Sequence, residues 1–146
     1  MTVEPPCAVD TSVAIALLVA SHEAHDVVRS WATGRSLVLS GHALAETYSV
    51  LTRLPGNARV SPADAVLLID DNFADPLLLS PEAAAGVHRE FARCGVSGGA
   101  TYDALVALAA REHGVVLATR DARARPTYEA VGARVDVVAG PSSGGD

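Results

Sequence analysis

The sequence predicts an α/β fold in which helices cover a central parallel sheet. Short apolar runs of strand length recur along the chain, and longer segments with helical patterns separate them. This alternation is typical of parallel strands, because each pair needs a crossover connection. The chain has 146 residues, 49% of them hydrophobic and 19% charged, which suits one core-rich domain.

Five apolar runs are predicted to be strands buried on both faces of the sheet, since they lack an alternation of apolar and polar residues. They are residues 8–9, 37–39, 77–79, 115–118 and 135–138.

The segments between these runs are predicted to be helices. Their approximate bounds are 12–32 in two pieces broken near Ser21, 42–54, 62–73, 81–93, 101–113 and 123–131. Ser61 followed by Pro62 is a typical capped helix start. Residues 95–99 form a glycine-rich connection. We expect a single domain over residues 1–140 and a flexible polar tail over 141–146.

The charge pattern excludes several functions. All 11 basic residues are arginine, so the chain lacks the lysine of a phosphate loop, of Schiff-base chemistry and of phospho-receiver domains. Cys7 and Cys94 stand too far apart in the sequence for a zinc knuckle. The N-terminus has no basic signal region, and no uncharged run is long enough to span a membrane. We therefore expect a cytoplasmic protein with no membrane contact.

Four acidic residues occur where predicted strands lead into helices, the edge at which open α/β sheets bind ligands. They are Asp10, Glu46, Asp103 and Asp121. The first three are each the only formally charged residue in a long stretch, and the helix after Asp103 is apolar on every side. A carboxylate in such surroundings must be solvated, paired or bound to a cation.

If the four acids converge, a hard divalent cation is the simplest remedy for their mutual repulsion. Carboxylate oxygens suit Mg²⁺ or Mn²⁺, and such ions activate water for attack on a phosphodiester. The alternative is that Asp10 and Asp121 cap helices, that Asp103 faces a helix dipole and that Glu46 is solvated.

Four stretches resemble, in order and over about residues 6–138, the PIN domain in the form found in VapC toxins. They are Val9-Asp10-Thr11-Ser12, Ala45-Glu46, Thr101-Tyr102-Asp103 with the four residues that follow, and Leu117-Ala118-Thr119-Arg120-Asp121. The resemblance implies a three-layer α/β/α fold with a central parallel sheet. It also implies a Mg²⁺- or Mn²⁺-dependent endoribonuclease acting on RNA, a homodimer, and a cognate VapB-type antitoxin.

The resemblance also implies roles for individual residues. Asp10 and Asp103 would be the principal metal ligands, with Asp121 and Glu46 completing the acidic cluster. Thr119 departs from family members that place an acid there, and its hydroxyl could bond to Asp121 or to the scissile phosphate. Thr11 and Ser12 are possible helpers at a helix start, although Ser12 could simply cap that helix.

Three arginines beside Asp121 could attract an RNA backbone. They are Arg120, Arg123 and Arg125, which could equally pair with Glu129 or Asp136 on the surface. A rival function is a catalytically silent PIN-like binding module that uses its acids to dock an arginine-bearing protein. Cleavage of RNA by the purified protein with Mg²⁺ or Mn²⁺, abolished by a chelator, separates the two functions.

Overall fold

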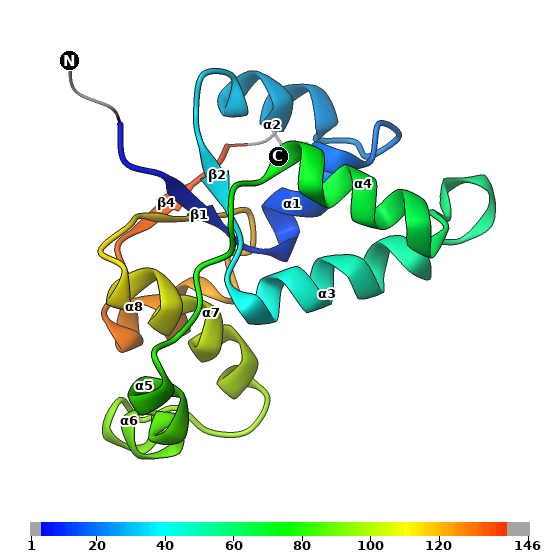
Figure 1. The fold of residues 1–146 in the computed structure, drawn as a ribbon. Coiled ribbons are helices and arrows are strands. Elements are labelled where there is room, and N and C mark those ends of the chain that lie inside the picture. The colour runs from blue at the N-terminus through cyan, green and yellow to red at the C-terminus, as the bar shows by residue number, and fades with distance from the viewer. Residues whose placement is uncertain (1–3, 140–146) are drawn as a thin grey trace.

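A computed structural model describes residues 4–139 and contains a parallel sheet of four short strands with helices around it (Figure 1). The strands are β1 (Cys7–Val9), β2 (Leu37–Val38), β3 (Leu117–Thr119) and β4 (Val135–Val137), and their order across the sheet is β2-β1-β3-β4. All three neighbouring pairs are parallel. The order reverses direction between β1 and β3, so the switch point of the sheet lies between these two central strands.

Eight helices are present in the described part of the chain. They are α1 (Thr11–Leu18), α2 (His25–Ala32), α3 (Gly41–Thr52), α4 (Pro62–Asn72), α5 (Pro81–Ala85), α6 (Val87–Arg93), α7 (Ala100–Glu112) and α8 (Arg125–Val131). The hydroxyls of Ser40, Ser61 and Ser80 accept backbone N–H groups at the starts of α3, α4 and α5. Each capped start satisfies a donor that would otherwise lack a partner within the helix.

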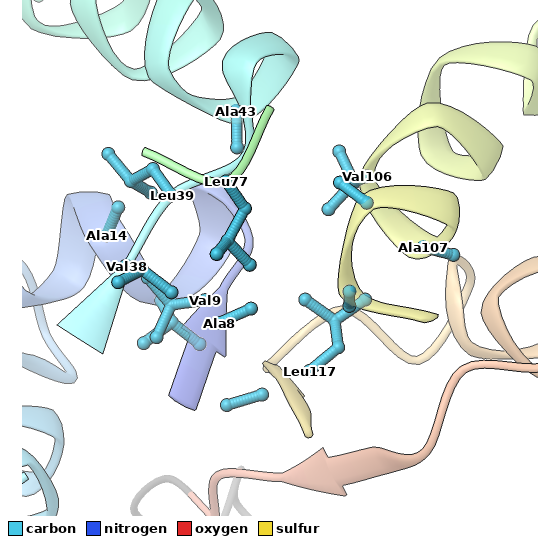
Figure 2. Close-up of a cluster of buried hydrophobic side chains, with 14 of the residues drawn as sticks. Ala8, Val9, Ala14, Val38, Leu39, Ala43, Leu77, Val106, Ala107 and Leu117 are labelled. Atoms are coloured by element: carbon cyan, nitrogen blue, oxygen red, sulfur yellow. The ribbon is translucent and has the colours of Figure 1, made fainter. Parts of the chain in front are cut away.

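The core lies on both sides of the central strands. In Figure 2, Ala14 of α1 lies on one side of the strand residues, and Val106 and Ala107 of α7 lie on the other. Val9 in β1 and Leu117 in β3 are fully buried between these layers. Six residues of α7 are buried, which confirms the prediction that this helix is embedded in the core. The three-layer α/β/α fold with a central parallel sheet is confirmed.

Three details differ from the sequence predictions. Residues 77–79 form only an isolated bridge, between Ser40 and Leu77, because Leu78 turns outward and is 62% exposed. The segment 81–93 is two helices that meet at Gly86. The last strand, β4, is not buried on both faces: it pairs with β3 alone at the edge of the sheet, and Val137 is 48% exposed.

The predicted tail over residues 141–146 lies outside the described residues. Within residues 4–139, every helix is too short or too polar to cross a lipid bilayer.

Candidate active site

The two central strands bring distant acids to one edge of the sheet. β1 ends at Val9 and is followed at once by Asp10; β3 ends at Thr119, two residues before Asp121. Ala8 and Val9 pair with Leu117 and Ala118, so the two strands end side by side. Parallel pairing thus places segments more than 100 positions apart in the sequence at the same edge.

Asp10 is held by four donors from three parts of the chain, α1, β3 and α8, and it is only 4% exposed. Its Oδ1 accepts the Ser12 hydroxyl at 2.6 Å and the Val13 N–H at 3.2 Å. Its Oδ2 accepts the Thr119 hydroxyl at 2.5 Å and the Tyr128 hydroxyl at 2.8 Å. These bonds compensate the carboxylate for its loss of water and fix its orientation. Asp10 is the N-cap of α1 as well, so the capping alternative and the site prediction are compatible.

Tyr128 is a member of this site that the sequence analysis missed. It lies in α8, is 2% exposed, and donates its hydroxyl to Asp10 from 118 positions away. Burial and the charge of Asp10 raise the pKa of Tyr128 above its ordinary value, so the hydroxyl stays protonated and remains a donor. A buried tyrosine in a short helix is more often a core residue, and no local pattern marks it as the partner of an acid.

The supporting hydroxyls are joined in one network. The Ser12 hydroxyl, besides donating to Asp10, accepts the Arg120 backbone N–H at 2.9 Å. The Thr119 hydroxyl accepts the Asp121 N–H at 2.9 Å while it donates to Asp10. The Thr119 hydroxyl therefore bonds to Asp121, one of the two alternatives considered, but to its backbone N–H and not to its carboxylate. Asp10, not Ser12, caps α1.

Glu46 reaches the same edge from α3. Its Oε1 accepts the Thr11 hydroxyl at 2.5 Å, which joins the start of α1 to α3 across 35 positions. The Glu46 side chain is otherwise exposed. Thr11 thus holds one acid and Ser12 and Thr119 hold another.

Asp103, in the first turn of α7, lies within the electrostatic influence of the other three acids. Its pKa is raised above the ordinary value, first by burial and then by the negative charges of Asp121, Glu46 and Asp10. The opposing influence comes from His42, whose positive charge lowers the pKa of Asp103. Ionised Asp103 is therefore disfavoured by its surroundings, as expected where like charges gather without a nearby arginine.

No three of the described Asp, Glu, His and Cys side chains stand ready as a metal-ligand set. The hydrogen bonds explain this: Asp10 is turned to its four donors, and Glu46 is turned to Thr11. The donor set nevertheless fits a hard divalent cation, because it consists of carboxylates that repel one another. The exposed side chains of Glu46 and Asp121 have the rotational freedom to close around such an ion.

Of the four acids, Asp121 lines a groove of about 430 Å³, together with residues of α1 and α3, His22 and Arg120. Its lining residues are Thr11, Ser12, Ile15, His22, Val50, Arg120 and Asp121. A larger hollow of about 510 Å³ lies at the opposite ends of the strands, around Cys7 and Val116, away from the acids. The groove beside the acids is the one that can present a ligand to them.

The three arginines after β3 differ in their contacts. The Arg120 guanidinium donates to the Val138 carbonyl at 3.2 Å. Arg125 pairs with Glu129 at 3.2 Å, one of the surface pairings considered above. Arg123 donates its backbone N–H to Asp121 at 2.9 Å, and its side chain is exposed.

The parallel sheet and the acids at its carboxyl edge define the PIN-like class of α/β proteins. The PIN domain model matches residues 7–129. The sequence is 57% identical to Ribonuclease VapC27 of Mycobacterium tuberculosis over 136 residues, 93% of this chain and 99% of that protein. It is 42% identical to Ribonuclease VapC40 of the same species over 130 residues, 88% of this chain and 96% of that protein. The chain belongs to the PIN-domain family and, within it, to the VapC ribonucleases.

Solved structures agree on the fold. Mycobacterium tuberculosis VapC20, a toxin that cleaves the sarcin-ricin loop, matches with a TM-score of 0.61 at 24% identity over 92% of this chain and 99% of that one. FitAcB from Neisseria gonorrhoeae matches with a TM-score of 0.60 at 19% identity over 88% of this chain and 95% of that one. At these identities the likeness concerns the arrangement of the helices and strands.

Proposed function

We propose that this VapC-family chain is the toxin of a type II toxin-antitoxin pair, an endoribonuclease that hydrolyses RNA phosphodiester bonds in the cytoplasm with Mg²⁺ or Mn²⁺. The observation that carries the proposal is the parallel pairing of β1 and β3, which brings Asp10 and Asp121 to one edge of the sheet, where Asp121 lines an open groove. The raised pKa of Asp103, to which the charges of Asp121, Glu46 and Asp10 contribute, supports it. A negatively charged edge is a poor site for RNA unless cations neutralise it.

The four acids would hold the cation. Asp10 and Asp103 would be the principal ligands, and Asp121 and Glu46 would complete the set. A bound Mg²⁺ or Mn²⁺ supplies an activated water and neutralises charge on a phosphodiester. Asp10 is fixed by its hydrogen bonds, whereas Glu46 and Asp121 are exposed and free to adjust. The site thus combines one rigid ligand with ligands that can follow the substrate.

Three hydroxyls support these ligands rather than contact the substrate directly. Ser12 and Thr119 orient Asp10, and Thr11 orients Glu46. Partners of this kind fix metal ligands and typically change affinity or activity by about 10- to 100-fold.

The arginines after β3 are proposed to meet the RNA backbone. Arg123 is the best placed of the three, because its side chain is exposed beside Asp121. Arg125 shares its charge with Glu129, a half-exposed pair that RNA phosphates could replace at small cost. Arg120 contributes mainly by joining the segment after β3 to Val138.

The partners proposed are RNA, a second copy of the chain and a VapB-type antitoxin. FitAcB and VapC20 are structural relatives of this chain. A chain from the structure of FitAB bound to a DNA fragment also matches this chain, with a TM-score of 0.63. An antitoxin segment bearing arginine would suit the acidic edge. The silent binding module is not favoured, since the relatives with 57% and 42% identity are named ribonucleases.

The test is cleavage of total RNA by the purified protein with Mg²⁺ or Mn²⁺, with the fragment ends mapped by sequencing. We expect discrete cuts that a chelator abolishes and that Asp10→Asn prevents while the fold is retained. Cleavage that persists in both Asp10→Asn and Asp103→Asn would refute the assignment of the site.

A further inference from the structure

Two aromatic rings from different helices stack at the mouth of the acidic edge. The imidazole of His42 in α3 lies against the phenol ring of Tyr102 in α7, with ring centroids 5.5 Å apart and an interplanar angle of 19°. His42 is half-buried, whereas Tyr102 is 59% exposed. The pair therefore has one ring supported by the protein and a second ring open to solvent.

Both rings are tied by sequence position to acids of the site. His42 precedes Glu46 by four residues, so the two lie on the same side of α3. Tyr102 directly precedes Asp103 in the first turn of α7. His42 is also close enough to Asp103 for its charge to influence that carboxyl. The exposed ring thus stands beside the acids that are proposed to act on the phosphodiester.

An exposed ring in this place suits a nucleobase. Every base has a π-face that can stack on a tyrosine, and base stacking of this kind does not depend on the sequence. A ring already held parallel by a neighbour loses little rotational freedom when a base joins it. Among the exposed aromatic residues, Tyr48 is 38% exposed and lies further along α3, away from the α7 start.

We propose that the His42–Tyr102 pair is a stacking platform that holds an unpaired nucleobase next to the scissile phosphodiester of single-stranded RNA. The inference rests on the proposed function for the presence of RNA at this edge. It assigns to Tyr102 a binding role that positions the substrate and selects for unstacked bases over duplex RNA.

A purely structural role for the stack, or a role in protein binding, would have different consequences. If the stack only joins α3 to α7, removal of the Tyr102 ring should lower the stability of the fold. If the exposed ring is instead a contact surface for a protein partner, its removal should weaken binding to that partner and leave RNA cleavage unchanged.

The main experiment measures cleavage of a single-stranded oligoribonucleotide whose cut has been mapped. An abasic residue is placed at each position in turn, and KM and kcat are measured for the wild type, Tyr102→Ala, Tyr102→Phe and Tyr48→Ala. We expect Tyr102→Ala to raise KM about tenfold on intact RNA, the loss typical of one stacked base. For the wild type, an abasic residue at one position should raise KM by a similar factor. Tyr102→Ala should cause no further rise on the RNA that is abasic at that position.

The control variants sharpen this expectation. Tyr102→Phe keeps the ring and should behave as the wild type, and Tyr48→Ala removes an exposed ring from α3 and should leave KM unchanged. Equal KM values for Tyr102→Ala and the wild type would overturn the proposal. The proposal would also be overturned if an abasic residue raised the KM of the wild type by the same factor at every position of the RNA, because that pattern indicates a structural effect.

A second measurement separates failure of the inference from failure of the proposed function. RNA that carries 2-aminopurine at a single position is mixed with each protein, and the emission, which falls on stacking, is recorded without reference to cleavage. We expect quenching at one position with the wild type and Tyr102→Phe but not with Tyr102→Ala. An absence of quenching with the wild type would overturn the platform, whether or not the protein cleaves RNA.

Discussion

The carboxylates near the two ends of α7 have opposite electrostatic surroundings. Near its N-terminus, Asp103 is surrounded by other acids, and its pKa is raised. Near its C-terminus, Arg111 donates to Glu90 of α6 at 2.6 Å, and Arg93 pairs with the same carboxylate. The hydrogen bonds from these two arginines lower the pKa of Glu90 to about 2. One end of α7 therefore bears a carboxylate that is not paired with an arginine, and its other end contacts a carboxylate of α6 that is paired with two.

The difference separates an acid that serves the fold from one that we propose serves the chemistry. Glu90 joins α6 to α7, and Arg111 extends that contact to the Val131 carbonyl at the end of α8. Within residues 4–139, Asp103 makes no ion pair that would link two elements, and its surroundings disfavour its negative charge. Groups with perturbed pKa values beside a cleft are candidates for function, whereas paired groups are typical of structure.

The largest expected effect comes from Asp103→Asn. We expect metal-dependent RNA cleavage to fall by more than about 100-fold, because loss of a ligand costs more than loss of a ligand's partner. The melting temperature should hold or rise, since the substitution removes repulsion with Asp10, Glu46 and Asp121. Kinetics and thermal melting on the same sample measure both effects, and Glu90→Gln, which should cleave RNA normally, is the matched control.

Addition of Mn²⁺ should stabilise the wild type against unfolding. At a concentration 100 times the dissociation constant, a ligand of the folded state contributes about 2.7 kcal/mol. Asp103→Asn should lose most of this gain, and Glu90→Gln should retain it. A gain of equal size in all three proteins, measured by thermal melting in Mn²⁺ and in chelator, would place the ion away from the acidic edge.

Tyr128→Phe tests the buried partner of Asp10. The substitution keeps the ring that packs in the core and removes the hydroxyl that donates to Asp10 at 2.8 Å. We expect Mn²⁺ affinity to fall by about 10- to 100-fold and stability to fall by about 1 kcal/mol. Calorimetric titration with Mn²⁺ measures the first effect. Unchanged affinity would mean that the other three donors suffice to orient Asp10.

Glu90→Gln should have the smallest effect, confined to stability and dependent on pH. The folded pKa of Glu90, about 2, lies below its ordinary value of 4.5, so ionised Glu90 stabilises the fold fully above pH 4.5. That contribution is lost as the pH falls toward 2. The melting temperatures of the variant and the wild type should therefore differ slightly at pH 7 and approach each other in acid. A difference that grows in acid would contradict this sign.

Local patterns in the sequence predicted most of the fold. Ser61-Pro62 marked the start of α4, and the apolar run after Asp103 marked a buried helix. The patterns failed where tertiary context decides. The leucines at 77–79 have strand composition, yet only Leu77 makes a bridge, and a contact from the His113 ring to the Leu78 carbonyl holds the segment on the surface.

The position of the acids at one edge of the sheet was predictable, whereas the side chains that contact them were not. Asp10 and Asp121 follow strands, and the topology of a parallel sheet brings such positions together. The hydroxyl of Tyr128 and the ring of Tyr102 have no local signal, since each acquires its role only from a residue on another element. Sequence position predicts which edge a residue reaches, and the packing of helices decides what it touches there.

The bond from Tyr128 to Asp10 has a consequence for synthesis of the chain. The first acid is made early, but its partners at positions 119 and 128 and the acid at 103 are translated late. An unfinished copy on the ribosome therefore lacks the residues that hold Asp10 in place. We expect nuclease activity to arise only after nearly the whole polypeptide has emerged.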